Sequence, residues 1–154
     1  MSRIRRVVIV GGGTAGWMAA SGLAKSLGGT IDITLVESDD IGTVGVGEAV
    51  IPLIKSFHAL LELDEKEFIH AVNGTYKLGI EFENWGRLGE SYFHPFGTPG
   101  VEAWAAQFHH YWLKACRQGE THALRNFSLE ASMAQAGRFT LNSEPQPQYA
   151  YHFD

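Results

Sequence analysis

The sequence predicts an α/β fold of the Rossmann type, and three observations near its N-terminus predict it. A β-branched run, residues 7–10, leads directly into a glycine-rich turn. Residues 15–27, which follow the turn, have the composition of a helix. A second β-branched run, residues 31–36, comes next and ends at Glu37. Strand, helix and strand in this order form a βαβ unit, the building block of a doubly wound parallel sheet.

The glycines of the turn after the first run have the spacing of a phosphate-binding motif. Gly11, Gly13 and Gly16 fall on G-x-G-x-x-G: the first allows the tight turn, the second lets backbone approach a pyrophosphate, and the third lets helix pack against strand. The unpaired N–H groups and positive dipole end of the helix then face the phosphates. Glu37 lies where an acid accepts hydrogen bonds from an adenosine ribose, and its charge argues against NADP. The alternative is an ordinary βαβ unit with a glycine turn.

Composition excludes several classes of protein. The chain has 154 residues and a net charge of -5, and no block of lysine or arginine indicates nucleic-acid binding. No apolar stretch approaches the roughly 20 residues that span a bilayer, and the apolar run near the N-terminus is too short for a signal peptide. The single cysteine, Cys116, excludes an internal disulfide and fits a cytoplasmic protein. We therefore expect neither a nucleic-acid nor a membrane partner.

Metal binding is not expected either, because no histidine, cysteine or carboxylate spacing typical of a metal site occurs. His109 and His110 are adjacent on an expected helix, so we expect them to point in different directions.

The middle of the chain predicts a loop and two helices. Residues 38–49 carry glycine at short intervals and indicate a loop that is mobile or closely packed. A helix is expected from Pro52 to about Leu61, since proline is tolerated in a first turn. Asp64, with Glu67 three residues on, predicts a capped helix that ends near residues 73–74.

Period-two alternation over residues 75–85 predicts one strand, with Lys77 on the face opposite the apolar set. Residues 91–96 predict a second strand, and residues 102–117 predict a helix. The aromatic residues of this helix at core spacing are Trp104, Phe108 and either Tyr111 or Trp112.

Near the C-terminus, Ser128 is expected to cap a short helix ending at Gly137, and residues 142–148 to form a connector. A doubly wound domain normally needs five or six strands, so we expect the chain to be the N-terminal portion of a larger protein. Within it, residues 1–52 are expected to hold the βαβ fold and its glycine-rich loop, and residues 53–154 to begin a second, ligand-facing region.

Several blocks, in this order and spacing, resemble the flavin-dependent tryptophan halogenases. They are the glycine-rich segment 11–20, Gly-Val-Gly-Glu-Ala at 45–49 with Pro52, Lys-Leu-Gly-Ile at 77–80 with Asn-Trp at 84–85, His-Pro-Phe at 94–96, and the terminal 151–154. The resemblance covers essentially the whole chain. It implies a Rossmann-like FAD-binding fold of the GR2 type, like that of flavoprotein monooxygenases, apparently truncated and holding part of a substrate region.

The resemblance also implies a two-part reaction. Reduced FAD, supplied by a separate flavin reductase, reacts with O2 and halide to give hypohalous acid. The acid then travels to a separate site, where a lysine presents electrophilic halogen to the indole ring of tryptophan or of free indole. Lys77 occupies that lysine's position; from the residues alone, a solvated surface charge is the favoured interpretation, because lysines are mostly exposed. Relatives of this kind are commonly homodimers.

The resemblance assigns further residues to ligands. Residues 39–52 correspond to the strap that covers the flavin. His94 and Phe96 match positions whose rings sandwich the indole. The residues assigned to FAD are Gly11, Gly13, Thr14, Ala15, Gly16, Glu37, Gly47, Glu48 and Ala49. From the residues alone, Glu48 is also compatible with an exposed loop carboxylate, Phe96 with a core position and His94 with a hydrogen-bonded loop residue.

Some features of the family pattern are absent or altered. The family's tryptophan-rich block, the glutamate that assists deprotonation of the indole, and the backbone site for halide would all lie beyond residue 154. The segment between Lys77 and His94 is shorter than in tryptophan-specific members, which is expected to open the pocket toward free indole or another aromatic. Two other functions stay open: a flavin monooxygenase that hydroxylates an aromatic substrate, and a non-catalytic flavin-binding homologue.

Overall fold

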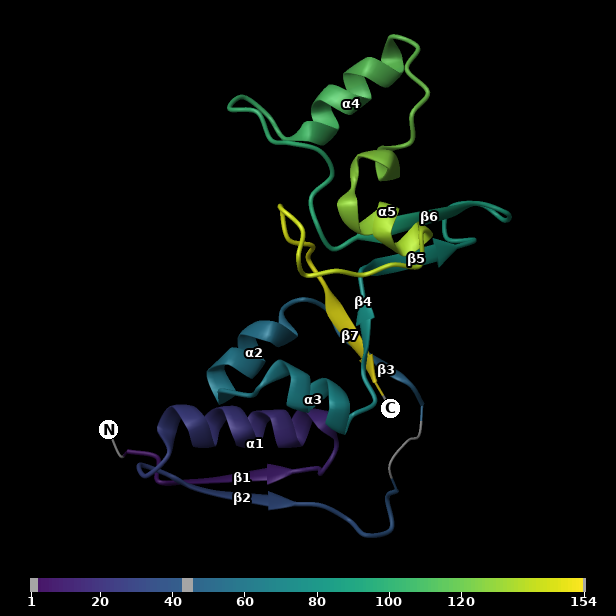
Figure 1. The fold of residues 1–154 in the computed structure, drawn as a ribbon. Coiled ribbons are helices and arrows are strands. Elements are labelled where there is room, and N and C mark those ends of the chain that lie inside the picture. Colours follow the sequence, from purple (N-terminus) through teal and green to yellow (C-terminus); the bar gives the residue numbers. More distant parts are fainter. Residues whose placement is uncertain (1–2, 43–45, 154) are drawn as a thin grey trace. The chain divides into compact units, whose positions relative to one another are not determined.

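The computed structural model describes residues 3–42 and 46–153, and the chain forms two compact units (Figure 1). The first unit contains the N-terminal residues to Glu48, residues 53–74 and Phe153. The second contains residues 49–52 and 75–152. Within the described ranges, no helix has the length and apolar character needed to cross a membrane.

The first unit contains the expected βαβ arrangement. Strands β1 (Arg6–Val10) and β2 (Asp32–Val36) pair in parallel, and helix α1 (Thr14–Leu27) connects them. Helix α1 covers one face of the two strands, and helix α2 (Ile54–Leu61) packs against α1 on its other side (Figure 1). A methyl group at Gly22 of α1 would lie 3.5 Å from the Phe57 ring of α2, so the two helices approach closely there.

The two helices that follow begin and end for local reasons. Helix α2 starts two residues after Pro52, which lies in the turn before it. Helix α3 (Glu65–Ala71) is capped as expected: the Asp64 carboxylate accepts hydrogen bonds from the backbone N–H groups of Lys66 and Glu67, both at 2.9 Å. Asn73, just past α3, adopts a left-handed conformation with φ of 47°.

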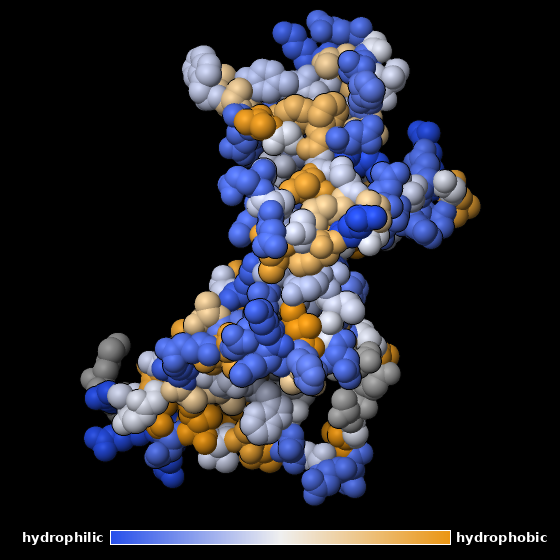
Figure 2. Space-filling model, viewed as in Figure 1, coloured by the Kyte–Doolittle hydropathy of each residue, from blue (hydrophilic) through white to orange (hydrophobic). Residues whose placement is uncertain are grey.

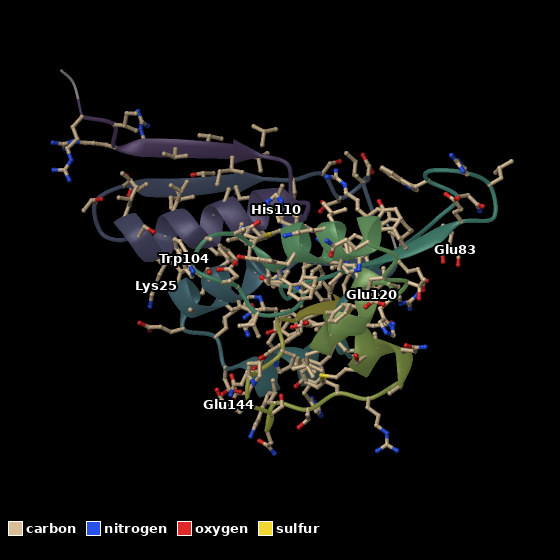
Figure 3. The ribbon with its side chains drawn as sticks, turned by 90° about the horizontal axis from the view of Figure 1, so that it is seen from above. Lys25, Glu83, Trp104, His110, Glu120 and Glu144 are labelled. Atoms are coloured by element: carbon tan, nitrogen blue, oxygen red, sulfur yellow. The ribbon has the colours of Figure 1, made fainter. Side chains whose placement is uncertain are left out.

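An ion pair joins the first unit's helices. The Lys25 ammonium (labelled in Figure 3) lies 2.8 Å from the Glu62 carboxylate at the end of α2. The hydrogen bond and charge of Lys25 lower the pKa of Glu62, and both side chains are substantially exposed.

The second unit corrects the expectation of one strand over residues 75–85. The segment forms two strands, β4 (Thr75–Lys77) and β5 (Gly79–Glu83), in different sheets. Strand β7 (Ala150–Phe153) lies between β4 and β3 (Glu48–Ala49), whereas β5 pairs antiparallel with β6 (Ser91–Pro95).

The change of sheet occurs at Leu78, which is buried. Its carbonyl accepts a hydrogen bond from the Phe96 N–H at 3.0 Å, beyond the end of β6. The alternating pattern is continuous through this point, so periodicity gives no sign of the break. Trp85, expected in the strand, lies in the following turn and is 75% exposed.

The helix expected over residues 102–117 is also shorter than predicted. Helix α4 covers only Phe108–Arg117, because Ala103 and Ala106 exchange backbone hydrogen bonds of 3.3 and 3.2 Å and reverse the chain before it. Trp104, between them (labelled in Figure 3), is fully exposed. The prediction that Trp104 belongs to the core was therefore wrong, while Phe108 and Trp112 are half-buried.

Helix α5 (Leu129–Gln135) follows a 3-10 turn, η1 (Leu124–Phe127), and packs against β5 and β6. The Ser128 hydroxyl accepts a hydrogen bond from the Ala131 N–H at 3.2 Å, which confirms the predicted cap, and Gly137 follows the helix with φ of 61°. The buried apolar side chains come from α5, from β7 and the residue before it, and from the residue between β4 and β5. They are Leu78, Ala131, Met133, Tyr149, Ala150 and Tyr151.

Candidate functional site

A cavity of about 1070 Å³ lies in the first unit, at the end of β1, the start of α1 and the end of β2. This is the carboxyl edge of the parallel strands, where α/β folds of this kind bind ligands. The residues that line it are Val10, Gly11, Gly12, Gly13, Thr14, Trp17, Val36, Glu37, Ser38, Asp39, Ile41, Gly42 and Glu48.

Five of the residues assigned to FAD from the sequence are in this lining: Gly11, Gly13, Thr14, Glu37 and Glu48. The other four are placed outside it. Ala15 and Gly16 lie further into the first turn of α1, Gly47 is an exposed loop residue, and Ala49 is in β3. Residues 43–45, part of the expected strap, lie outside the described residues.

The start of α1 presents bare backbone to the cavity. Its N-cap residue is Gly13, no side chain caps the first turn, and no acidic residue lies in that turn. The first N–H groups of the helix and its positive dipole end are thus directed at the ligand space, and none of the residues of the first turn brings a negative charge to them. A methyl group on Gly13 would meet no atom within 4 Å, so this side of the turn is open.

Gly12 and Gly16 of the same turn are enclosed by protein. A methyl group on Gly16 would collide with the Gly11 carbonyl oxygen, which shows how closely helix and strand approach. A methyl group on Gly12 would collide with the Glu37 carboxylate. Gly12 therefore lets Glu37 lie directly against the turn, a role that the sequence spacing did not indicate. The Gly11 N–H also donates to the Val36 carbonyl at 2.8 Å, which joins the ends of β1 and β2.

Glu48 is tied to this site by its side chain. The Thr14 hydroxyl donates a hydrogen bond to the Glu48 carboxylate at 3.4 Å, so the first residue of α1 contacts the end of the glycine-rich loop. Trp17, one turn further along α1, lines the same cavity and is 53% exposed. Trp17 was not among the residues expected to bind a ligand, although its place in the glycine-rich segment is a usable signal.

A second group of functional side chains lies in the second unit, around Lys77 at the end of β4. The Lys77 ammonium donates a hydrogen bond to the Val50 carbonyl at 3.3 Å and lies 5.5 Å from the centre of the Phe96 ring. A cation over an aromatic face is attracted by the ring's negative face. Partial burial lowers the pKa of Lys77, because it disfavours the charged form.

The structure thus brings Lys77 and Phe96 together, as expected for two residues of one site. His94, two residues before Phe96 on β6, pairs across the hairpin with Ile80 and is exposed. The Val50 carbonyl is a partner that sequence reasoning missed, since a backbone acceptor leaves no trace in the residue pattern. It lies two residues after Glu48 in the chain.

The remaining histidines form no metal site. The ring centres of His109 and His110 lie 4.0 Å apart, closer than expected for side chains that point in different directions, because adjacent helix positions about 100° apart still allow two rings to meet. Across the described parts of the chain, no group of three histidine, cysteine or acidic residues is placed to hold a metal ion.

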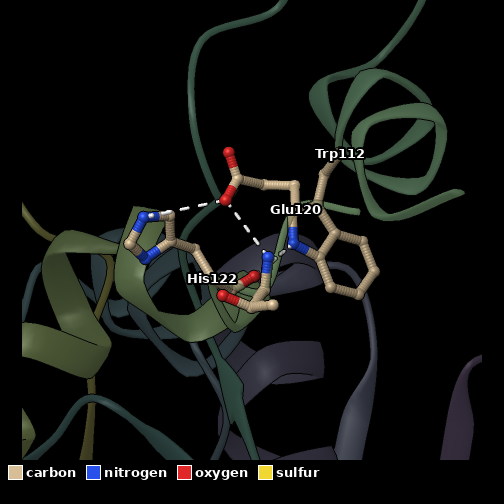
Figure 4. A network of polar contacts seen from close by, with 4 residues as sticks. Trp112, Glu120 and His122 are labelled. Atoms are coloured by element: carbon tan, nitrogen blue, oxygen red, sulfur yellow. Dashed lines mark hydrogen bonds and ion pairs between the residues drawn. The ribbon is translucent and has the colours of Figure 1, made fainter. Parts of the chain in front are cut away.

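The end of α4 holds a small exposed polar network (Figure 4). The Trp112 indole N–H donates to the His122 carbonyl at 2.7 Å, and the Glu120 carboxylate lies 3.8 Å from the His122 ring nitrogen. The Thr121 N–H donates to the same carboxylate at 3.1 Å. These contacts close the loop after α4. They give the polar groups of the network hydrogen-bond and ionic partners within the protein, so no ligand is needed to explain them.

A parallel βαβ unit, a glycine turn that leads into an uncapped helix N-terminus, and an acid at the end of the second strand define a dinucleotide-binding protein of the Rossmann class. The chain belongs to the tryptophan halogenase family, whose model matches residues 6–154.

Individual relatives agree with this assignment. The chain is 37% identical to the tryptophan 7-halogenase RebH of Lentzea aerocolonigenes over 99% of its length, and 55% identical to the tryptophan 6-halogenase SttH of Streptomyces toxytricini over 59%. It spans 32% and 17% of these two relatives. A solved flavin-dependent halogenase from Xanthomonas campestris is 52% identical, with a TM-score of 0.89 over 99% of this chain and 31% of that one.

Proposed function

We propose that this chain forms the FAD-binding part, and the first portion of the substrate site, of a flavin-dependent halogenase. The whole enzyme makes hypohalous acid from reduced FAD, O2 and halide, and halogenates the indole ring of tryptophan or of free indole. The observation that carries the proposal is Lys77, a partly buried ammonium held between a backbone carbonyl and an aromatic face. Membership of the tryptophan halogenase family supports it.

The first-unit cavity fits the cofactor. Its volume, about 1070 Å³, lies just above the range of about 300–1,000 Å³ that is typical of ligand pockets, which suits a ligand as large as FAD. Gly11 and Gly13, with the open N-terminus of α1, would hold the pyrophosphate, and Glu37 would accept hydrogen bonds from the ribose hydroxyls. Thr14 and Glu48 would close the cavity from the loop side. Ala15, Gly16, Gly47 and Ala49 remain part of the proposed cofactor region.

When bound and reduced, FAD supplies, together with O2, the oxidising equivalents that convert halide to hypohalous acid. Lys77 then acts on that product in one of two protonation states. As an ammonium it donates a hydrogen bond to hypohalous acid and polarises the halogen. As a neutral amine it takes up the halogen with release of water, and the resulting haloamine transfers the halogen to a ring carbon, which loses its proton. Partial burial, which lowers the pKa of Lys77, favours access to the amine form.

Phe96 and His94 would hold the substrate ring. An aromatic face next to Lys77 provides offset stacking for an electron-rich ring within reach of the ammonium. The hairpin turn between β5 and β6 is compact: the Asn84 N–H donates to the Glu90 carbonyl at 2.8 Å, and the Asn84 side chain accepts from the Gly89 N–H at 2.6 Å. This short turn supports a pocket that admits free indole as well as tryptophan.

The test uses the full-length enzyme with reduced FAD, O2 and bromide or chloride, and offers tryptophan and indole. Lys77→Ala and the length-matched Lys77→Met are expected to lose about 10²–10⁴-fold in halogenated product, read by mass spectrometry, while reduced flavin is still oxidised by O2. Lys114→Ala, which removes an exposed lysine of α4, is the control and should halogenate normally. Normal halogenation by Lys77→Ala, or a product that gains only oxygen and forms without halide, would contradict the proposal.

Further partners follow from the same proposal. A separate flavin reductase would supply reduced FAD, and we propose that the full-length enzyme forms a homodimer. A reducing cytoplasm is the proposed location, in keeping with a single free cysteine, Cys116.

A further inference from the structure

Glu130 is a buried acid in the second unit that the halogenase chemistry described above does not use. It lies in the first turn of α5 and is only 5% exposed, next to Ser128, which is 2% exposed. Buried glutamates are rare unless their oxygens are paired. Both oxygens of Glu130 are paired, and the identity of its partners indicates what the residue does.

The two carboxylate oxygens join separate segments of the chain. One accepts a hydrogen bond from the Ser128 hydroxyl at 3.1 Å, at the cap of α5. The other accepts from the Gln148 backbone N–H at 2.9 Å. Gln148 lies two residues before Ala150 of β7, and Ala150 is the residue that pairs with Lys77 of β4. Glu130 thus holds the segment just before β7, the strand that pairs with β4 and Lys77.

The same carboxylate also contacts the loop that carries Phe96. Gly97 lies so close to it that a methyl group there would collide with both oxygens of Glu130. Three residues on, the Gly100 N–H donates to the Phe127 carbonyl at 2.7 Å, just before α5. The loop after β6 is therefore fixed at both ends by the segment that begins α5.

We propose that Glu130 is a positioning residue that sets the distance between Lys77 and the aromatic face of Phe96. The Glu130 carboxylate holds both the segment before β7, which pairs beside Lys77, and the loop that follows Phe96. Holding both segments keeps the Lys77 ammonium 5.5 Å from the centre of the Phe96 ring. This inference rests on the proposed function, because it gives the pair a substrate ring to orient. A displacement of about 1 Å at such a site can cost on the order of 10²-fold in rate.

The test is made on the full-length enzyme with Glu130→Ala, and with Glu83→Ala as the matched control. Glu83 is an exposed acid of β5 in the same unit (labelled in Figure 3). We expect Glu130→Ala to lower kcat for halogenation by about tenfold to a hundredfold, to raise KM for the indole substrate, and to change the ratio of ring positions halogenated. Oxidation of reduced FAD by O2 should keep its parental rate, and Glu83→Ala should resemble the parent throughout.

A second variant guards against loss of folding. Gly97→Ala keeps the carboxylate but forces it away from the loop, so it should show the same fall in kcat and the same change in isomer ratio. If Glu130→Ala does not fold, Gly97→Ala decides the question. Folded variants with parental kcat, KM and isomer ratio would overturn the proposal.

The failure of the proposed function gives a different result. If the parent enzyme forms no halogenated product, that function fails, and crystal structures of the parent and of Gly97→Ala then test the positioning role. A Lys77–Phe96 distance that changes in the variant supports the role of Glu130, and one that stays at 5.5 Å overturns it.

Discussion

Lys77 combines a charged hydrogen-bond donor with surroundings that disfavour its charge. Its partners are a neutral carbonyl, Val50, and an aromatic face, Phe96, neither of which supplies a full negative charge. Partial burial therefore dominates, and it lowers the pKa of Lys77 below its ordinary value. A lysine with a lowered pKa holds a larger share of neutral amine at a given pH than an ordinary lysine does, which suits a residue that has to react with an electrophilic halogen.

The lowered pKa of Lys77 has a measurable consequence for stability. The folded chain binds the Lys77 proton less tightly than the unfolded chain, in which lysines have a pKa of about 10.4. The free energy of unfolding should therefore be reduced by this group at every pH below its folded pKa, and should rise as the pH increases from that folded pKa toward about 10.4. Carbon-13 NMR of dimethylated lysines measures the midpoint directly, and the resonance that Lys77→Arg removes should titrate below the ordinary value. A midpoint at or above that value would contradict the assigned environment.

At the scale of elements, the first unit could be predicted well because its signals are local. The glycine spacing fixed the turn before α1, and Asp64 supplied a cap whose hydrogen bonds are present in the structure. The features that escaped prediction depend on segments far apart in the chain. Leu78 interrupts a continuous alternating pattern only because β7 and β6 pair on either side of it, and the chain reversal at Ala103 and Ala106 removes a turn of helix that the aromatic spacing indicated.

The residues of the candidate site also divide into those with a local sequence signal and those without one. Gly11, Gly13, Thr14, Glu37 and Glu48 could be assigned from motifs, and they line one cavity. Contacts made by backbone atoms or by a buried acid carry no motif, so the Val50 carbonyl and the carboxylate of Glu130 could not be found from the residue pattern.

The glycine turn before α1 permits a prediction that separates folding from ligand binding. Gly16→Ala places a methyl group against the Gly11 carbonyl and should destabilise the fold by about 1–3 kcal/mol. Gly13→Ala has open space and an extended backbone, so the free energy of unfolding should change by no more than about 0.5 kcal/mol. Its methyl group would nevertheless occupy the approach of a pyrophosphate, so affinity for FAD should fall. Thermal unfolding and FAD titration of both variants measure the two effects, and an unchanged FAD affinity in Gly13→Ala would argue against this pyrophosphate site.

At the scale of the whole molecule, burial is uneven. Every buried apolar side chain in the described ranges belongs to the second unit. In the first unit, α1 covers one face of β1 and β2, while the other face exposes Val8 at 62%, Val10 at 85% and Val36 at 49%. Apolar side chains are visible among hydrophilic ones on the surface in Figure 2. Exposed valines on a strand face are typical of a surface that another part of a protein covers.

This distribution predicts how the 154 residues behave by themselves. The first unit buries too little apolar surface to be well stabilised, so its backbone amides in β1 and α1 should exchange with deuterium faster than those of α5 and β7. Because the cofactor cavity is built from that weaker unit, we expect weak FAD binding and no turnover from this piece. Hydrogen exchange and an FAD titration, each compared with the full-length protein, measure the difference. Equal protection in both units together with tight FAD binding would show that β1, α1 and β2 need no further covering to hold the cofactor.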